Sequence, residues 1–324
     1  MIKTALIGAG GIAGTHLAFL KSRKDVELAG ICDTNFIKAE ERVRSFGGRA
    51  YKDIGQMLDS EKPQAVWVCT PPKVRSEPLL ACAKRNIPVF CEKPAEAGLQ
   101  EAESLNRKLA ETKAKVQVGY VFRCIPAVKK LKEQMQDDKI HLVQSLYSCN
   151  LSLTDEISAP RFNKSITGGL LVEQATHNFD LLRYLFGEVS SVSGLASNPV
   201  HKKQGDYSID EVIALSLKFE SGMIASHCHS WAGDSWRNVI TIIGEKRLYR
   251  LSLFDRILTV DTGEQKRELA DPADSAYDYE DGIFLDMAVS GDWKKNPSTY
   301  EDAIKTLKLS LDAESAVAFP HQAK

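Results

Sequence analysis

Short apolar runs alternate with segments of helical periodicity along the first 120 residues. Each run is apolar at almost every position, and between the runs apolar residues recur at spacings of three and four. The apolar runs lie at 3–7, 26–32, 65–70, 89–93 and 116–120. Strands that are apolar on both sides are buried on both faces, and their alternation with helices is typical of a parallel sheet. We therefore predict a doubly wound, Rossmann-type α/β domain over residues 1–121.

After Tyr120 strand-like runs follow one another with few helices between them. These runs lie at 142–153, 188–196, 211–219, 222–230, 238–244 and about 247–260. Helical segments lie at about 169–186, 280–291 and 299–316. Strands in series are typical of an antiparallel sheet with helices on one face. Residues 122–324 are therefore predicted to form an α+β domain around a large, mainly antiparallel sheet whose other face is open.

A glycine-rich turn joins the first apolar run to the first helical segment. In "LIGAGGIAG" the order is Gly8-x-Gly10-x-x-Ala13. Gly8 permits a tight turn, Gly10 lets a pyrophosphate approach the backbone, and Ala13 is small where the helix meets the strand. The helix N-terminus offers unpaired N–H groups to the phosphates. This context predicts a dinucleotide site rather than an ordinary tight turn.

Asp33 stands at the end of the second apolar run, where a carboxylate can hydrogen-bond the adenosine ribose. A carboxylate there repels a 2′-phosphate, so the sequence favours NAD over NADP as the cofactor. Lys38 lies close enough in the sequence to weaken this preference, and NADP stays possible. The residues expected to bind the cofactor are Gly8, Gly10, Gly11, Ile12, Ala13, Asp33, Thr70, Pro71, Glu92 and Lys93.

Lys93 ends the fourth apolar run, "VFCEK", and is followed at once by Pro94. In open parallel sheets, ligands bind beyond the carboxyl ends of the strands. The neighbouring run ends in the same way, at Thr70 and Pro71. Because a proline cannot continue a central strand, we predict that this strand carries Lys93 to the ligand-binding edge of the sheet. The alternative is a solvated lysine on a surface loop.

A second cluster of polar residues lies in "GGLLVEQATHNFD", where Glu173, His177 and Asp180 are spaced four and three apart. On a continuous helix all three share one face. A carboxylate beside an imidazole orients it and raises its basicity, which general-base catalysis requires. The alternative is an ordinary polar helix face.

Two arrangements also have the spacing of metal ligands. Glu173 and His177 could bind zinc, but further clear ligands are lacking. His227 and His229 share one face of a strand in "SHCHS". Without cysteine or aspartate partners they are expected to be packed or solvent-facing, and no metal site is predicted.

Composition narrows the class of partner. The chain carries 42 Lys+Arg and 43 Asp+Glu, a formal net charge of -1, which gives no electrostatic reason to bind nucleic acid or an anionic membrane. No apolar run approaches the length needed to cross a bilayer. The 7 cysteines are scattered, with no C-x-x-C pair, as in a reducing compartment. We expect a cytoplasmic protein with a small-molecule substrate.

Taken together, these segments resemble the Gfo/Idh/MocA oxidoreductases of sugars and polyols along essentially the whole chain. The motifs that carry the resemblance are the glycine turn, "CTPP", "CEKP", "VGYVFRCIPAVKKLKE", "GGLLVEQATHNFD" and "YEDAIKTLKLSLDAESA". The resemblance implies that Lys93 contacts the reacting hydroxyl and lowers its pKa. It also implies that His177 is the general acid/base and that Glu173 takes the place of the catalytic carboxylate. The substrate-binding residues it implies are Lys93, Arg123, Arg161, Glu173, His177 and Asp180.

The sequence departs from the family pattern at three positions. The family more often has aspartate in place of Glu173 and glycine in place of Ala175, so His177 can be held differently here. Many members have a histidine where this chain has Arg75. We expect Arg75 to face solvent rather than to meet an anionic group of the substrate.

These observations predict an NAD(P)-dependent oxidoreductase. Hydride would pass between nicotinamide and a secondary alcohol or ketone of a sugar, polyol or sugar derivative. Two alternatives stay open: a redox-neutral NAD-dependent glycosidase that uses transient hydride transfer, and a non-catalytic dinucleotide-binding sensor. The apolar strands 211–219 and 222–230 call for a covering partner, and the resemblance also implies a homodimer or homotetramer.

Overall fold

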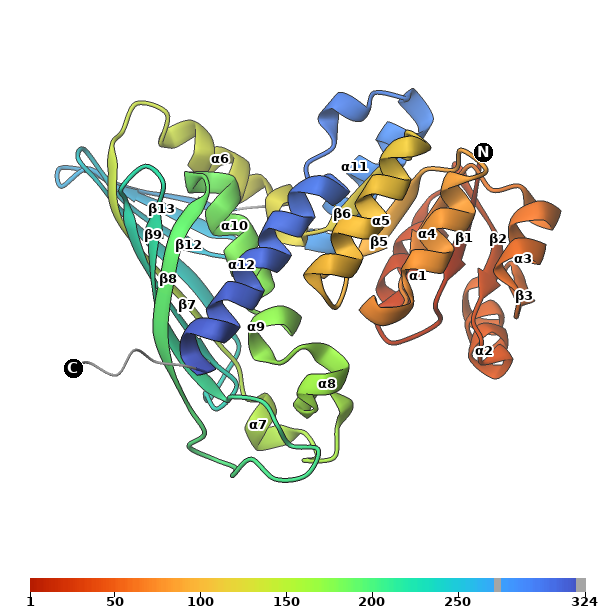
Figure 1. Ribbon diagram of the computed structural model, residues 1–324. Helices are drawn as coiled ribbons and strands as arrows, with labels where there is room; N and C mark the ends of the chain where they lie inside the picture. Colours follow the sequence, from red (N-terminus) through yellow and green to blue (C-terminus); the bar gives the residue numbers. More distant parts are fainter. Residues whose placement is uncertain (271–274, 319–324) are drawn as a thin grey trace. The chain divides into compact units, whose positions relative to one another are not determined.

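The computed structural model describes residues 1–270 and 275–318. The chain forms two compact units, and each is described by itself (Figure 1). The first unit comprises Met1–Cys124 and Asp274–Lys305, and the second comprises Ile125–Ala273 and Thr306–Lys324. The pattern of the sequence placed the whole C-terminal part in the second domain, whereas the fold returns one C-terminal segment to the first unit.

The first unit is built on a six-stranded parallel sheet in the order β3-β2-β1-β4-β5-β6. The strands are β1 (Ile2–Ile7), β2 (Val26–Cys32), β3 (Arg49–Tyr51), β4 (Ala65–Val68), β5 (Val89–Glu92) and β6 (Val116–Gly119). The strand order reverses between β1 and β4, which is the switch point of a doubly wound sheet. The predicted Rossmann architecture is confirmed. Three residues are too few for a periodic signal, so the sequence did not predict β3.

Helices cover both faces of this sheet. They are α1 (Ala13–Ser22), α2 (Phe36–Phe46), α3 (Ile54–Glu61), α4 (Ser76–Ala83), α5 (Leu99–Glu111) and α11 (Ala276–Ser290). Single 3₁₀ turns are η1 (Pro72–Val74), η2 (Val121–Cys124) and η4 (Trp293–Lys295). The returning segment belongs here because Phe284, Leu285 and Met287 of α11 are buried in one hydrophobic core with Trp67 and Phe90. Burial of this apolar surface stabilises the unit.

The second unit contains an eight-stranded sheet in the order β14-β13-β12-β11-β7-β10-β9-β8, antiparallel except where β7 meets β10. The strands are β7 (Ile140–Ser148), β8 (Val189–Ser197), β9 (Val212–Phe219), β10 (Ile224–Ser230), β11 (Arg237–Gly244), β12 (Leu248–Ser252), β13 (Ile257–Asp261) and β14 (Lys266–Ala270). The prediction of a mainly antiparallel sheet is confirmed. The run at 247–260 forms two strands, because a turn after Ser252 reverses the chain.

The helical elements of this unit are α6 (Pro126–Gln134), α7 (Leu151–Thr154), η3 (Pro160–Phe162), α8 (Lys164–Thr167), α9 (Leu170–Glu173), α10 (Thr176–Phe186) and the part of α12 (Tyr300–Ala318) beyond residue 305. Phe179 of α10 packs against His227 of β10 with ring centroids 5.4 Å apart. In β9 alternate residues are buried, while Ala214, Ser216 and Lys218 between them are exposed. One face of the sheet is therefore covered, and the other lies open.

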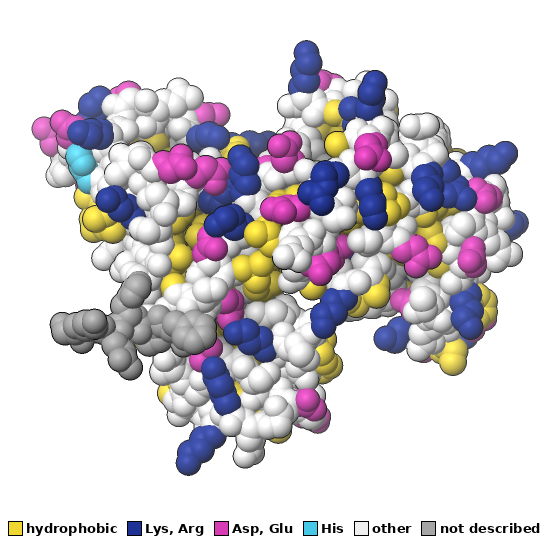
Figure 2. Space-filling view, in the orientation of Figure 1, with side chains coloured by type: hydrophobic (Ala, Val, Ile, Leu, Met, Phe, Trp, Pro, Cys, Tyr) yellow, Lys and Arg dark blue, Asp and Glu magenta, His cyan; other side chains and the backbone are white. Residues whose placement is uncertain are grey.

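Charged side chains of both signs are mixed on one face of the molecule (Figure 2). Figure 2 shows Lys and Arg side chains interspersed with Asp and Glu over the face it presents. In the described part of the chain, no helix has both the length and the apolar character needed to cross a membrane. Over residues 1–270 and 275–318, no three His, Cys, Asp or Glu side chains gather as metal ligands would.

Candidate functional site

The glycine turn closes against the end of β4. Gly8 has φ +97°, and a Cβ atom there would lie 2.8 Å from the carbonyl carbon of Cys69 and from the amide nitrogen of Thr70. Other residues rarely adopt this conformation, and the backbone leaves no room for a side chain. Only glycine therefore fits at this position.

The residues after Gly8 leave space where a ligand could approach. A Cβ atom at Gly10 or Gly11 would meet no atom within 4 Å. Helix α1 begins at Ala13, and Ile12 before it provides no side-chain cap for the first turn. An uncapped N-terminus presents N–H groups and a partial positive charge to an anion. This end of the unit fits the pyrophosphate of a dinucleotide.

Asp33 is tied to the glycine turn. One oxygen of its carboxylate accepts a hydrogen bond from the Ala9 amide at 2.7 Å, and the other accepts from the Asn35 amide at 2.8 Å. A carboxylate can accept about four hydrogen bonds, so acceptor capacity is left for a ribose hydroxyl. Arg42 of α2 donates to the carbonyl oxygen of Gly10 at 2.8 Å. Arg42 was not predicted as a site residue, because nothing in the helical pattern distinguishes it from its charged neighbours.

The carboxyl ends of β4 and β5 present polar groups side by side. Strand β5 ends at Glu92, and Lys93 follows it, as predicted. Pro71 lies beside Thr70 and is exposed, whereas the Thr70 hydroxyl is buried and has no hydrogen-bond partner among the described residues. A buried hydroxyl without a partner is costly, and a bound ligand would satisfy it.

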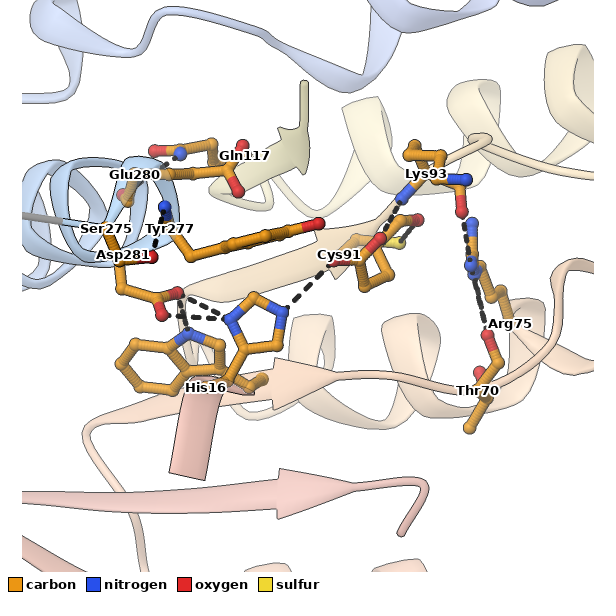
Figure 3. A network of polar contacts seen from close by, with 12 residues as sticks. His16, Thr70, Arg75, Cys91, Lys93, Gln117, Ser275, Tyr277, Glu280 and Asp281 are labelled. Carbon is orange, nitrogen blue, oxygen red and sulfur yellow. Dashed lines mark hydrogen bonds and ion pairs between the residues drawn. The ribbon is translucent and has the colours of Figure 1, made fainter. Parts of the chain in front are cut away.

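Arg75 was expected to face solvent, and the structure shows that this was wrong. It is 2% exposed. Its Nε and Nη2 donate to the carbonyl oxygen of Thr70 at 3.1 and 3.0 Å, and Nη2 also donates to that of Lys93 at 2.9 Å (Figure 3). Free carbonyl oxygens at the strand ends attract the guanidinium into the protein, and local sequence does not reveal such acceptors.

Glu92 is buried within a group of polar side chains that we call the charged histidine cluster: His16, Trp67, Glu92 and Asp281. Figure 3 shows the ring of His16 facing Asp281. Nδ1 of His16 lies 2.8 and 2.9 Å from the two Asp281 oxygens, and Nε2 lies 3.1 Å from Glu92 Oε1. The indole of Trp67 donates to Asp281 at 2.8 Å. The second oxygen of Glu92 accepts from the Lys93 amide at 3.0 Å.

The charge state of this cluster follows from its partners. Burial lowers the pKa of His16, but the carboxylates of Asp281 and Glu92 outweigh it and raise the pKa to about 10. Burial alone would raise the pKa of Glu92, yet hydrogen bonding and attraction to His16 lower it overall. His16 is therefore an imidazolium between two carboxylates near neutral pH. This cluster could not be predicted from the sequence, because 265 residues separate His16 from Asp281.

Arg123 also lies in the first unit and is 5% exposed. It forms an ion pair with Asp302 at 2.6 Å and donates to the carbonyl oxygen of Pro297 at 2.7 Å. These contacts join η2 to the returning C-terminal segment. The family resemblance implied that Arg123 binds the substrate, and the structure gives it partners within its own unit.

Glu173 and His177 lie in the second unit, on two helices rather than one. Helix α9 ends at Glu173 and α10 begins at Thr176, with Gln174 between them at φ −121° and ψ −46°. The prediction of one continuous helix over 169–186 was therefore wrong. The apolar spacing runs through the break because Leu171, Ala175 and Leu182 are all buried. Glu173 and His177 are both half-buried.

Gln174 stands at one end of a series of hydrogen-bonded side chains that we call the neutral histidine chain. Its members are Ser145, His227, His229, Gln174 and Trp231. The Trp231 indole can only donate, so the Gln174 atom that it meets is the acceptor Oε1. The same oxygen lies 2.9 Å from His229 Nε2, which therefore carries the proton. His229 Nδ1 then accepts from His227 Nε2 at 3.3 Å, and His227 Nδ1 accepts from the Ser145 hydroxyl at 3.0 Å.

Both histidines of this chain are fully buried. Burial lowers the pKa of His227 to about 3. Burial, together with repulsion from His227 and His177, holds the pKa of His229 well below its usual value. Of the two possibilities left open by the sequence, packed or solvent-facing, the structure shows the first. Both rings are neutral, and their nitrogens form hydrogen bonds with protein groups.

Two further predicted residues lie in this unit. Asp180 is 1% exposed and accepts a hydrogen bond from Thr306 of α12 at 3.0 Å. Arg161 lies in η3, with its side chain 40% exposed and paired with Asp155 at 3.0 Å. The predicted cofactor residues thus all fall in the first unit. The predicted acid–base pair falls in the second.

Comparison with known proteins gives the family. Residues 2–120 match the oxidoreductase family with an NAD-binding Rossmann fold, and residues 127–250 match the GFO/IDH/MocA C-terminal domain. The two matches come from one family and together cover most of the chain.

Individual relatives agree with this assignment. Myo-inositol 2-dehydrogenase of Thermotoga maritima is 28% identical over 225 residues, which is 69% of this chain and 66% of that protein. Glucose-6-phosphate 3-dehydrogenase of Bacillus subtilis is 24% identical over 336 residues, 95% of this chain and 94% of that protein. A structure of levoglucosan dehydrogenase in complex with NADH and levoglucosan has the same fold, with a TM-score of 0.85, 20% identity, and coverage of 98% of this chain and 97% of that one. The chain therefore belongs to the Gfo/Idh/MocA family of oxidoreductases, with its NAD-binding Rossmann fold in the first unit.

Proposed function

We propose that this protein is an NAD(P)-dependent dehydrogenase of a sugar, polyol or sugar derivative, acting on a secondary alcohol. The observation that carries the proposal is the placement of Lys93 at the carboxyl end of β5. The neighbouring strand β4 leads to Thr70, whose buried hydroxyl has no hydrogen-bond partner among the described residues. Relatives named as dehydrogenases of an inositol and of a sugar phosphate support the substrate class. When bound, NAD supplies the hydride acceptor.

The chain's own residues would handle the proton and the developing charge. Lys93 would donate a hydrogen bond to the reacting hydroxyl and stabilise the alkoxide that forms as its proton leaves. His177 would take that proton as general base. Glu173 is the last residue of α9, and His177 lies in the first turn of the next helix, α10. Glu173 would orient the imidazole of His177.

The other predicted residues have supporting parts in this proposal. Arg161 is the exposed candidate for a substrate contact. Arg123 and Asp180 are buried and bonded to Asp302 and Thr306, which favours a supporting role for each within its own unit. For the cofactor, Asp33 favours NAD, because its carboxylate would repel a 2′-phosphate.

The test is nicotinamide absorbance with purified protein, NAD or NADP, and a panel of polyols, free sugars and glycosides. We expect NADH to appear with one class of substrate. Lys93→Met and His177→Ala should each lower kcat by at least about 100-fold. Turnover of Lys93→Met within a few-fold of wild type would contradict the roles assigned here. If no NADH forms, cofactor released on denaturation would identify a redox-neutral enzyme, and its absence a sensor.

We also propose that the open face of the eight-stranded sheet pairs with a second copy of the chain. Strand register sets apolar side chains in two rows across this face. One row contains Leu195, Ala214, Cys228, Leu146 and Val239, and the other contains Ile224, Leu142, Ile243 and Leu248. Exposed apolar rows of this kind favour an interface. The seven free thiols, six of them buried, support a reducing, cytoplasmic location.

Sedimentation at micromolar concentration tests the pairing. We expect wild type to sediment as a dimer or tetramer, and Leu146→Asp as a monomer. Leu153→Asp is the matched control, because Leu153 is also exposed but lies on α7, away from the sheet. A monomeric wild type would rule out the interface.

A further inference from the structure

Arg75 is a charged side chain that is shielded from solvent. It is nearly fully buried, and within the described part of the chain it forms no ion pair. Its Nη1 group is buried and has no acceptor among the described residues. Burying a guanidinium is costly. The carboxylates of Glu92 and Glu96 attract it electrostatically, but neither forms an ion pair with it. Its direct contacts are therefore the two carbonyl oxygens.

The geometry of the guanidinium suggests what it does. Its planar fork reaches the carbonyl oxygens of Thr70 and Lys93, which follow two neighbouring strands (Figure 3). One rigid group that bonds both carbonyls sets the spacing between the two strand ends. A lysine carries a single nitrogen on a flexible stem and does not reproduce this fork.

Lys93 is held from its other side as well. Its amide donates to Glu92, and His16 in turn binds Glu92. The main chain of Lys93 is thus fixed at its N–H by Glu92 and at its C=O by Arg75. Two fixed peptide groups determine where the lysine side chain begins, and small displacements at a reacting centre are costly.

We propose that Arg75 is a positioning residue for Lys93. It acts through the main-chain carbonyl groups of Thr70 and Lys93, which follow the neighbouring strands β4 and β5. The inference rests on the dehydrogenase reaction proposed above. In that reaction Arg75 places the ammonium group of Lys93 against the substrate hydroxyl, while the pyrophosphate and the adenosine ribose of the dinucleotide are bound by the glycine turn and Asp33.

The first experiment compares Arg75→Lys with wild type and with Lys73→Gln. Lys73 is the matched control, because it lies in the same turn and is exposed. We expect Arg75→Lys to lower kcat by about 100-fold while the Kd for NAD, measured by calorimetry, stays within about threefold. Lys73→Gln should leave both unchanged. If Arg75→Lys keeps the kcat of wild type, the positive charge is sufficient and the proposal is overturned.

Hydrogen exchange separates this inference from the proposed function. We expect the peptide covering residues 89–97 to exchange faster in Arg75→Lys than in wild type, whether or not a substrate is known. Absence of turnover in wild type would contradict the proposed function alone. Unchanged exchange in this peptide would contradict the positioning role alone.

Chemical rescue covers the case in which Arg75→Lys does not fold. Arg75→Ala leaves a space that methylguanidinium can enter, and we expect it to raise kcat at least tenfold. Methylammonium, which carries the charge without the fork, should not. Equal rescue by both ions, or no rescue of the folded variant, would overturn the proposal. Loss of the fold in both variants would assign Arg75 to stability and overturn it too.

Discussion

Each unit of this protein buries histidines in a polar network, and the two networks are built on opposite charge states. In the first unit one histidine lies between two carboxylates, and its pKa rises to about 10. In the second, two histidines lie in series between a serine hydroxyl and a glutamine oxygen, and the pKa of His227 falls to about 3. All three rings are fully buried.

The difference shows that burial does not decide the charge of a histidine by itself. Desolvation lowers the pKa in every case, and the partners decide whether that effect prevails. Carboxylates have no proton to donate, so His16 must donate from both nitrogens and is charged. Ser145 can donate to a ring nitrogen, so His227 can stay neutral. The charged cluster holds Glu92 beside Lys93, whereas the neutral chain holds Gln174 at the break before His177.

The largest expected effect comes from removing the cation of the charged cluster. His16→Leu leaves the carboxylates of Asp281 and Glu92 buried without their partner, and we expect the free energy of unfolding to fall by about 3–5 kcal/mol. Urea unfolding near pH 7 measures it. His141→Leu is the control, because His141 is exposed, and it should change stability by less than about 0.5 kcal/mol. A loss below about 1 kcal/mol in His16→Leu would show that the carboxylates do not depend on the imidazolium.

Acid should weaken the neutral chain. The folded pKa values of His227 and His229 lie below the usual 6.5, so the unfolded state binds more protons below that pH. Their contribution is present above pH 6.5 and is lost as the pH falls toward about 3. The slope is about 1.4 kcal/mol per pH unit for each ring. Urea unfolding between pH 6.5 and 5 should show it, and His227→Gln should reduce it; an unchanged slope in that variant would contradict the assignment.

Gln174→Leu should break the neutral chain at its acceptor. The Trp231 indole and His229 Nε2 would lose the oxygen that they share, at a cost of about 2 kcal/mol in the free energy of unfolding. Gln174→Glu keeps an oxygen acceptor and adds a negative charge, which should raise the pKa of His229 and make this region resemble the charged cluster. NMR titration of the His229 ring measures that shift. If Gln174→Leu is as stable as wild type, the oxygen is not the anchor of the chain.

Alkali acts on the single ring of His16, so the slope expected here is the smaller of the two pH slopes. Its folded pKa is raised, so its contribution is fully present below pH 6.5 and is lost as the pH rises toward about 10. Stability should fall by at most about 1.4 kcal/mol per pH unit across that window. Urea unfolding of wild type and His16→Leu between pH 7 and 9 compares the slopes. Equal slopes would mean that another group titrates there.

Much of the first unit could be predicted from the sequence, because its signals are local. Continuous apolar runs followed by helices predict a parallel sheet, and Gly8 marks the turn where only glycine fits. The apolar run and Pro94 predicted the end of β5 to within one residue, at Lys93 where the structure has Glu92. Strand β3 was missed because it is too short to show a pattern.

The features that could not be predicted depend on distant partners. His16 and Asp281 are far apart in the chain, and no residue near either of them in the sequence shows that the two come into contact. Arg75 is buried because it binds two main-chain carbonyl oxygens. Every residue has such an oxygen, so the sequence does not indicate which ones lack another partner. The helix break at Gln174 was hidden because apolar spacing is the same on both sides of it.

The bond between Asp33 and the Ala9 amide has a consequence for engineering the cofactor preference. Redesign for a phosphorylated dinucleotide usually begins by removing the acidic residue at this position. Here that residue also braces the glycine turn, so Asp33→Ala would loosen the binding loop while it removes the repulsion. Asp33→Asn keeps an oxygen for the Ala9 amide and loses the charge, which makes it the better first step toward an enzyme that accepts NADP.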